Sequence, residues 1–332
     1  EDGATLVIHE HFNNYGTYTD AGGAIEFTGN VDHVIFNSNP MTVNTIHCNS
    51  SNGLTIEGRH IRVINEIQVS KGMVNTNDSL VLVSSADQTA RIDELKTTCK
   101  YTINMTDDYG DSWNGAELSI YESGKLIETF SCIGAASSGL FEVVGGNAFT
   151  VEYTGGSYEY ENEYEILNED GEVIFSDGPS PAEGTVYSGT AEGCSFASSI
   201  IGDITMQRYI DAGETYWRYF ASAVKNPAIQ QYLDDFVTSG FDGSHYPDFP
   251  FTSIYSYDET RDPYDGYVAC ESASEVINVG QGYQVWNGDT MTGTDPFLVD
   301  LVGPANQGDL ILPVTYTFSG VPSEDGWNLI GN

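Results

Sequence analysis

The fold of this chain is decided by residues 53–83, GLTIEGRHIRVINEIQVSKGMVNTNDSLVLV, where short apolar and β-branched runs alternate with turns of Gly, Asn and Ser. Similar runs occur upstream at residues 24–27 and 34–36. β-branched residues favour strands, whereas Gly, Asn and Ser favour turns. Short strand-turn units cannot bury an apolar face alone, but stacking them as rungs buries it. The pattern predicts a β-solenoid-like repeat domain over residues 1–97, with an ordinary β-sandwich as the alternative.

A second all-β unit is expected at residues 98–195. Its first run, YTINM at 101–105, alternates apolar and polar residues, and shorter apolar runs follow between turns. Alternating strands separated by turns are typical of a β-sandwich. Cys99 and Cys194 bracket this unit. A disulfide between them would close a loop of roughly 95 residues and stabilise the fold by around 4 kcal/mol in the chain-entropy model.

The remaining residues, 196–332, are expected to form a C-terminal β-sandwich. Its expected strands include residues 204–210, 216–220, 282–286, 309–314 and 327–330. The best helical candidate of the whole chain is NPAIQQYLDDFV at 226–237, with a Pro near its start and a Gly just beyond its end. Nearly everything else has the pattern of short strands between turns, so the predicted fold class is all-β.

The charge of the chain excludes two classes of partner. Asp and Glu number 49 against 11 Lys and Arg, which gives a net charge of −38 at pH 7. A nucleic-acid binder needs cations to neutralise phosphates, and an anionic membrane surface repels such a chain. No run approaches the roughly 20 apolar residues of a membrane helix, so membrane insertion is not expected either. A surface this acidic suits divalent cations, or contacts that salt must screen.

The cysteines and the lack of catalytic motifs favour a secreted protein that is not an enzyme. The five cysteines are widely separated and none forms a C-x-x-C pair, so one or two disulfides in an oxidising compartment are expected. The odd number leaves at least one thiol free or paired with another chain. No G-x-S-x-G elbow, phosphate loop or dinucleotide fingerprint occurs in the sequence. The expected location is therefore extracellular or at the cell surface.

The strongest candidate site is the acidic turn DDYGDSWNG at residues 107–115. Calcium takes about six to eight hard oxygen ligands, often including backbone carbonyls and water. The expected side-chain ligands are Asp107, Asp108, Asp111 and Asn114, joined by Glu161 and Glu163 from a neighbouring Tyr-rich strand. The alternative is an Asx-rich turn whose side chains only cap local backbone amides. Trp113 is expected to be a packed core anchor rather than a platform for a sugar.

Four motifs of the third unit, in their order, resemble a segment of large surface proteins of the Bacteroidota that type IX secretion exports. They are GDITMQRYI at 202–210, WRY at 217–219, GQGYQV at 280–285 and GWNLIGN at 326–332. LVLVSS at 80–85 and TARI at 89–92 resemble the end of the repeat region that precedes this segment. The resemblance implies a secreted, surface-associated, non-catalytic protein with an inserted middle unit. It also implies further strands beyond residue 332, so the C-terminal sheet is expected to be incomplete.

The middle unit is similar to CUB-like extracellular modules. The similarity rests on DDYGDSWNGA at 107–116 and on GGSYEYENEYEILNEDGEVIFSDG at 155–178. Such modules often carry D-x-Y-G-D-G-W-N-G, from which this chain departs at Ser112. The resemblance implies an inserted β-sandwich and makes the expected calcium site a CUB-like one.

Two functions are consistent with these features. The first is a structural subunit of a cell-surface or filamentous assembly, in which copies of the chain join head to tail through β-strand complementation. The residues expected at this contact are Leu6, Val7, Ile8, Leu329 and Ile330. The alternative is a calcium-dependent adhesin or glycan-binding module of a larger surface protein. The expected partners are therefore copies of the chain, other surface proteins or glycans.

Two surface positions match a modification pattern. Ser79 in DSL and Thr290 in DTM fit the D-S/T-apolar pattern of O-glycosylation in the Bacteroidota. Motifs this short also occur by chance, so an unmodified surface is the alternative.

Overall fold

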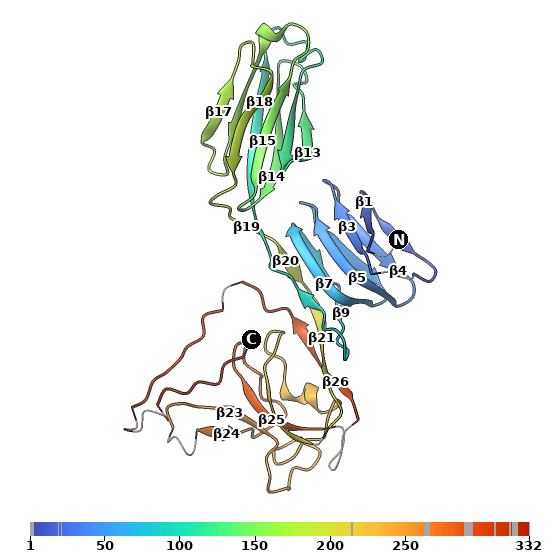
Figure 1. Cartoon of the computed structure of the whole chain (residues 1–332), viewed down its shortest axis with the longest axis vertical. Coiled ribbons are helices and arrows are strands. Elements are labelled where there is room, and N and C mark those ends of the chain that lie inside the picture. The colour runs from blue at the N-terminus through green and yellow to red at the C-terminus, as the bar shows by residue number, and fades with distance from the viewer. Residues whose placement is uncertain are drawn as a thin grey trace.

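The computed structural model describes residues 3–18, 20, 22–213, 215–261, 266–288, 295–308, 310–318, 320 and 325–331. The protein is all-β, as the sequence predicts, with 51% of its residues in strands and 2% in helices. Figure 1 shows three parts along the long axis, with the N-terminal strands between an outlying β-rich unit and a C-terminal sheet.

Residues 5–82 form the predicted β-solenoid-like region of about four turns. Successive strands alternate between two parallel sheets. The first sheet contains β1 (Thr5–Ile8), β3 (Ala24–Thr28), β5 (Met41–Asn49), β7 (Ile61–Lys71) and β9 (Leu80–Leu82), with the short β10 (Arg91–Ile92) paired to β7. The second sheet contains β2 (Phe12–Asn14), β4 (His33–Asn37), β6 (Leu54–Gly58) and β8 (Met73–Asn75).

The register of the solenoid explains why its turns stack. Ile25 pairs with Ile46, and Ile46 pairs with Ile67, so one isoleucine column runs through three successive strands of the first sheet. All three side chains are fully buried. Each turn therefore stacks its apolar side chains on those of the next turn, as expected for a repeat array.

The middle unit consists of two antiparallel sheets around one core. The first sheet contains β14 (Ala136–Val144), β11 (Thr97–Asp107), β16 (Asn162–Leu167) and β17 (Val173–Asp177), with β19 (Phe196–Ala197) paired to β11. The second contains β13 (Lys125–Phe130), β12 (Glu117–Glu122), β15 (Ala148–Thr154) and β18 (Gly184–Thr190). A short 3-10 helix, η1 (Glu159–Glu161), precedes β16. Buried aromatic side chains from both sheets, including Tyr101, Phe149 and Tyr153, share the core.

The chain returns from the middle unit to complete the solenoid. β20 (Ser199–Ile201) pairs with β8 in the second sheet, and β21 (Asp203–Ile210) pairs in parallel with β9 in the first. β26 (Phe297–Pro304) then closes this sheet antiparallel to β21. Strands of the predicted units 1–97 and 196–332 therefore lie in the same sheets and share one core, whereas the middle unit predicted at 98–195 has a core of its own.

The C-terminal part carries a further antiparallel sheet. It contains, in order of pairing, β22 (Tyr216–Phe220), β25 (Tyr283–Asn287), β23 (Ile254–Tyr257) and β24 (Tyr267–Ala269). The strands expected at 309–314 and 327–330 do not occur among the described residues, where Ile330 makes a single antiparallel bridge with Gln281. The sandwich arrangement of this part stays a prediction.

The helix predicted at residues 226–237 is wrong. Only the short 3-10 helix η2 (Ile229–Tyr232) forms there. The N–H groups of Ile229 and Gln230 donate to the carbonyls of Glu275 and Ala273 on a neighbouring segment. These tertiary contacts override the local helical preference. No helix of the described residues is long and apolar enough to cross a bilayer.

Candidate cation site

The acidic turn lies at the end of the middle unit that is remote from its attachment to the solenoid. β11 starts near Cys99 and ends at Asp107, which is paired with Asn162 at the start of β16. This antiparallel register places the turn at 107–115 beside η1. The backbone N–H of Asp108 donates to the carbonyl of Glu161 at 3.0 Å and joins the two segments.

Trp113 holds the turn against the core, as the sequence predicts. Its side chain is fully buried, and its indole Nε1–H donates to the carbonyl oxygen of Thr106 at 2.8 Å. Its ring makes edge contacts with Tyr153 and Tyr164. A buried indole with a satisfied donor fixes the residues on both sides of it.

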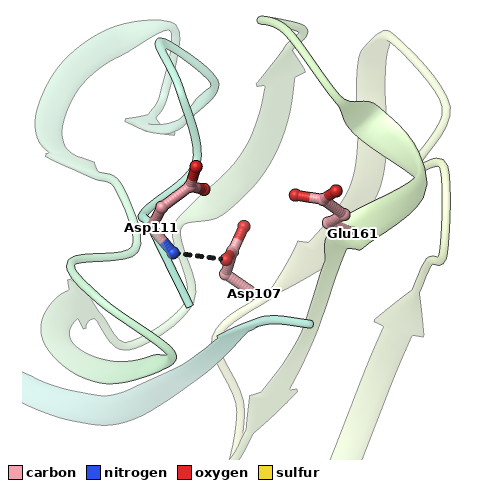
Figure 2. A group of neighbouring side chains, drawn as sticks. All are labelled: Asp107, Asp111 and Glu161. Carbon is pink, nitrogen blue, oxygen red and sulfur yellow. Dashed lines mark hydrogen bonds between the residues drawn. The ribbon is translucent and has the colours of Figure 1, made fainter. Parts of the chain in front are cut away.

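Three of the predicted ligands come together. Carboxylate oxygens of Asp107, Asp111 and Glu161 all lie within 4.8 Å of one another. Figure 2 shows Asp107 between the other two side chains, with the backbone N–H of Asp111 donating to it at 3.0 Å. The cluster joins the end of β11 and the turn that follows it to η1 (Glu159–Glu161), which lies far along the sequence.

Asp107 is the distinctive member of this cluster. Its side chain is only 3% exposed, and its Oδ1 accepts N–H bonds from Gly110 and Asp111. Its Oδ2 is buried and has no hydrogen-bond partner. A buried polar atom without a partner costs about 1–3 kcal/mol, and more when it is charged. A cation held between the three carboxylates would remove this cost.

The other predicted ligands take different positions. Asn114 donates its amide to Asp111 Oδ1 at 2.9 Å and so orients a ligand. Asp108 and Glu163 are exposed and do not join the cluster of three carboxylates. Glu161 ends η1 whereas Glu163 lies within β16, so the two do not lie on one strand as expected. Oδ1 of Asp107 caps local backbone amides, as the Asx-turn alternative predicts. That alternative does not explain why Oδ2 is buried without a partner.

The backbone of the turn is tightly curved. Ser112 and Asn114 have φ angles of 84° and 48°, in the left-handed region that favours Gly. A Gly would adopt this conformation at position 112 without strain. Ser112 compensates in part, because its hydroxyl accepts the backbone N–H of Gly134 at 2.9 Å.

Three exposed tyrosines lie close in sequence to the carboxylates of the cluster, and no role for them is expected from the sequence. Tyr109, Tyr158 and Tyr160 are 78%, 58% and 63% exposed. The rings of Tyr158 and Tyr160 meet edge to face with centroids 6.4 Å apart. A hydrogen bond to Glu161 raises the pKa of the Tyr160 phenol, which places this ring beside a candidate ligand. The signal that could have revealed them is the YEYE alternation at 158–161 next to the acidic turn.

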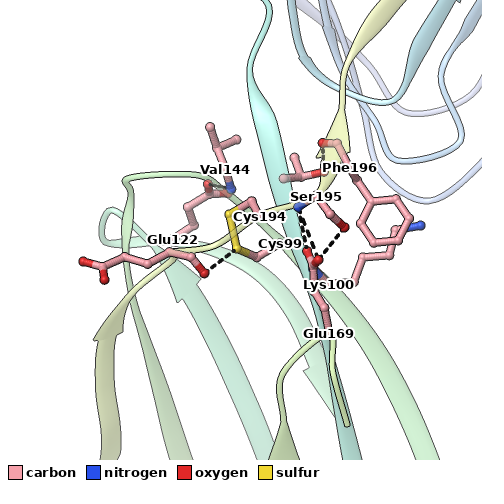
Figure 3. The surroundings of a disulfide bond; sticks show 10 residues. Cys99, Lys100, Glu122, Val144, Glu169, Cys194, Ser195 and Phe196 are labelled. Atoms are coloured by element: carbon pink, nitrogen blue, oxygen red, sulfur yellow. Dashed lines mark hydrogen bonds between the residues drawn. A yellow bond between two sulfur atoms is a disulfide. The ribbon is translucent and has the colours of Figure 1, made fainter. Parts of the chain in front are cut away.

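The opposite end of the middle unit carries the disulfide. Cys99 and Cys194 are bonded, with the sulfur atoms 2.00 Å apart. Figure 3 shows Glu169 beside this bond, where its carboxylate accepts the backbone N–H groups of Lys100 and Ser195. The remaining three cysteines are buried free thiols: Cys48, Cys132 and Cys270. Burial raises the pKa of Cys48 to about 11 and that of Cys270 to about 12, so neither forms a thiolate near neutral pH.

The predicted assembly residues have partners within their own chain. Residues 6–8 lie in β1, whose only pairing among the described strands is with β3. Leu329 accepts the N–H of Gly282 at 3.0 Å. Of the two predicted glycosylation sites, Ser79 is half-buried and donates to the carbonyl of Asn77, and Thr290 lies outside the described residues.

Comparison with known proteins gives no match among family models, curated proteins or solved structures. The similarity to type IX secretion cargo and to CUB-like modules therefore stays a prediction. The function has to be argued from the chemistry of the site.

Three carboxylates from two segments, the turn at 107–115 and η1, form a hard-oxygen donor set without nitrogen or sulfur. Such a set favours Ca²⁺ or Mg²⁺ over Zn²⁺. Calcium–oxygen distances of about 2.3–2.6 Å allow ligands on opposite sides of the ion to lie about 5 Å apart. The ligand oxygens of this cluster lie within 4.8 Å of one another, close enough to bind one such ion together. Magnesium usually keeps several waters and takes only one or two carboxylates, so a set of three carboxylates favours calcium.

Proposed function

We propose that this protein is a non-catalytic extracellular binding protein whose middle unit recognises a partner through a bound Ca²⁺ ion. The observation that carries the proposal is the buried Oδ2 of Asp107, which has no partner and faces two further carboxylates. Asp107, Asp111 and Glu161 would hold the ion. The ion would supply a fixed positive charge on a chain whose net charge is −38.

The position of the site supports recognition rather than a purely structural metal. Asp111 is exposed and Glu161 is half-buried, so part of the coordination sphere would face solvent. The solenoid lies at the opposite end of the unit, where the disulfide is. A partner could therefore reach the ion without contacting the solenoid.

Calcium titration of the whole chain tests the proposal. We expect isothermal titration calorimetry to give one binding event, and Tb³⁺ in place of Ca²⁺ to luminesce through the nearby Trp113. Calcium at about 100 times its Kd should stabilise the fold by about 2.7 kcal/mol. The Asp107→Asn variant keeps an oxygen to cap the turn and should lose the binding event.

Glu163→Gln is the matched control, since it removes one negative charge close to the site from an exposed side chain outside the cluster. This variant should bind calcium as the parent chain does. Equal calcium affinity of Asp107→Asn and the parent chain would refute the site.

A second candidate function is assembly with copies of the chain. It is favoured by the exposed apolar side chains of an extended segment at 310–318, where Ile311 is 93% and Phe318 is 74% exposed. In β1, Leu6 and Val7 are also 43% and 44% exposed at the edge of the eight-stranded sheet. Exposed edges of this kind accept strands from other chains.

Removal of residues 1–10 tests strand exchange through β1. Light scattering and electron microscopy should show smaller assemblies for the shortened chain than for the whole chain. Large assemblies that persist unchanged without this segment would show that the contact does not use it.

A further inference from the structure

We infer that the calcium ion and the three exposed tyrosines around it form one binding surface for a neutral saccharide with vicinal hydroxyl groups. The inference rests on the proposed calcium site and names the ligand of that site. The surface consists of Asp107, Asp111, Glu161 and the side chains of Tyr109, Tyr158 and Tyr160.

The protein supplies too few oxygens to complete the coordination of calcium. Oδ1 of Asp107 already accepts two backbone N–H groups, and Oδ1 of Asp111 accepts the Asn114 amide. The free oxygens of the three carboxylates number fewer than the six to eight that calcium takes. Because Asp111 is exposed, the remaining positions are open to solvent. A pair of neighbouring hydroxyl groups can replace two waters there without adding charge.

The tyrosines provide the second half of the surface. In the sequence, Tyr109 lies between the ligands Asp107 and Asp111. Tyr158 and Tyr160 lie just before the third ligand, Glu161. Their rings are more than half exposed, although burial of aromatic rings is strongly favoured. Exposed aromatic groups that gather at one place indicate a contact surface. Tyrosine rings offer flat apolar faces with a polar edge, which suit the apolar face of a sugar ring.

The backbone at Tyr158 gives an independent reason to assign a binding role. This residue has φ 62° and ψ 38°, a left-handed conformation in which Gly is the least strained residue. A bulky side chain here costs about 1–2 kcal/mol. The ring is 58% exposed, so core packing does not offset this cost. A contact with a ligand does account for a Tyr at this position.

The charge of the surroundings selects the class of saccharide. Glu159, Asp108 and the ligands themselves are acidic, and neither the turn at 107–115 nor residues 155–163 contain a Lys or Arg. An anionic sugar would be repelled by these groups, whereas a neutral sugar would not. A cationic peptide is the other ligand that such a surface could attract, since Lys and Arg also stack on tyrosine rings, but a cationic side chain offers no oxygen to the open coordination positions of the ion.

A glycan array of neutral oligosaccharides, probed with the whole chain in Ca²⁺ and in EDTA, tests the inference. We expect binding in Ca²⁺ that is lost in EDTA. Tyr109→Ala and Tyr158→Ala should each lower saccharide affinity by about tenfold, equivalent to about 1.4 kcal/mol, with calcium affinity unchanged in a Tb³⁺ titration. Tyr15→Ala is the matched control, because Tyr15 is 74% exposed but lies in the solenoid.

The outcomes separate the two proposals. If the chain binds calcium but no neutral saccharide on the array, the saccharide inference is wrong and the calcium site stands. If it binds no calcium, the proposed function itself fails. If poly-L-lysine binds in a calcium-dependent manner and the saccharides do not, the surface recognises cationic peptides, which also overturns the inference.

Discussion

The two ends of the middle unit share the same strands but differ in how completely their polar groups are satisfied. Near the solenoid, Glu169 binds the backbone on both sides of the disulfide. At the remote end, Asp107 Oδ2 and the side-chain oxygens of Asn162 and Tyr164 are buried without partners. Native proteins leave few such groups unpaired. The difference indicates that one end is built for attachment and the other for a ligand.

The attachment also includes a buried ion pair. Lys71 from β7 is 7% exposed and donates to Glu122 Oε2 and to the carbonyl of Glu142, both at 2.8 Å. Glu122 Oε1 in turn accepts the N–H of Val144 and the amide of Asn147. Each charge therefore has charged and neutral partners, which a buried ion pair needs in order to offset desolvation.

Loss of the disulfide at the attached end should lower the unfolding free energy of the middle unit more than any other single change. Cys99 and Cys194 are 95 residues apart, and closing a loop of that length stabilises a fold by about 4–5 kcal/mol in the chain-entropy model. Replacing both residues by Ser should lower the unfolding free energy of the middle unit by about this amount, measured by denaturant titration and hydrogen exchange. Reductant should destabilise the parent chain but leave the double variant unchanged. A variant as stable as the parent would mean that the remaining contacts alone attach this end.

The sequence predicts the strands of the solenoid better than it predicts which distant strands pair with one another. Short β-branched runs with Gly and Asn turns predict the rungs of the solenoid, because the signal is local. The pairing of β20 with β8 and of β21 with β9 spans the whole middle unit, and no local pattern specifies such a register. The last turn of the solenoid was therefore not foreseen.

The candidate site was predicted in part for a similar reason. Hard oxygen donors in the turn predict Asp107 and Asp111, and the Tyr-rich strand expected beside the turn predicts Glu161 together with Glu163. Whether Glu161 or Glu163 reaches the turn depends on where η1 ends and β16 begins, and such boundaries are poorly determined by sequence. The burial of Asp107 is a property of packing around Trp113 and cannot be seen in a sequence.

Breaking the buried ion pair between Lys71 and Glu122 should cause the next largest loss of unfolding free energy. Lys71→Met leaves the Glu122 carboxylate buried without its cation, which should cost about 3 kcal/mol. Urea unfolding should show this loss, and a calcium titration should show unchanged affinity, because the site lies at the other end of the unit. The double variant Lys71→Met with Glu122→Gln should regain part of the lost stability, since no unpaired charge remains. A loss below about 0.5 kcal/mol in the single variant would mean that the pair is solvated and contributes no more than a surface pair.

The smallest expected change in stability comes from relieving the backbone strain at Tyr158, at the remote end of the middle unit. Tyr158→Gly and Tyr158→Ala both remove the ring, but only Gly relaxes the left-handed backbone at φ 62°. Strain of about 1–2 kcal/mol is offset in part by the greater flexibility of Gly in the unfolded chain, about 0.5–1 kcal/mol. The Gly variant should therefore be about 0.5–1 kcal/mol more stable than the Ala variant in thermal and urea unfolding, while both bind saccharide equally weakly. If the two variants are equally stable, position 158 is not strained, and the remote end loses one of the features that distinguish it from the attached end.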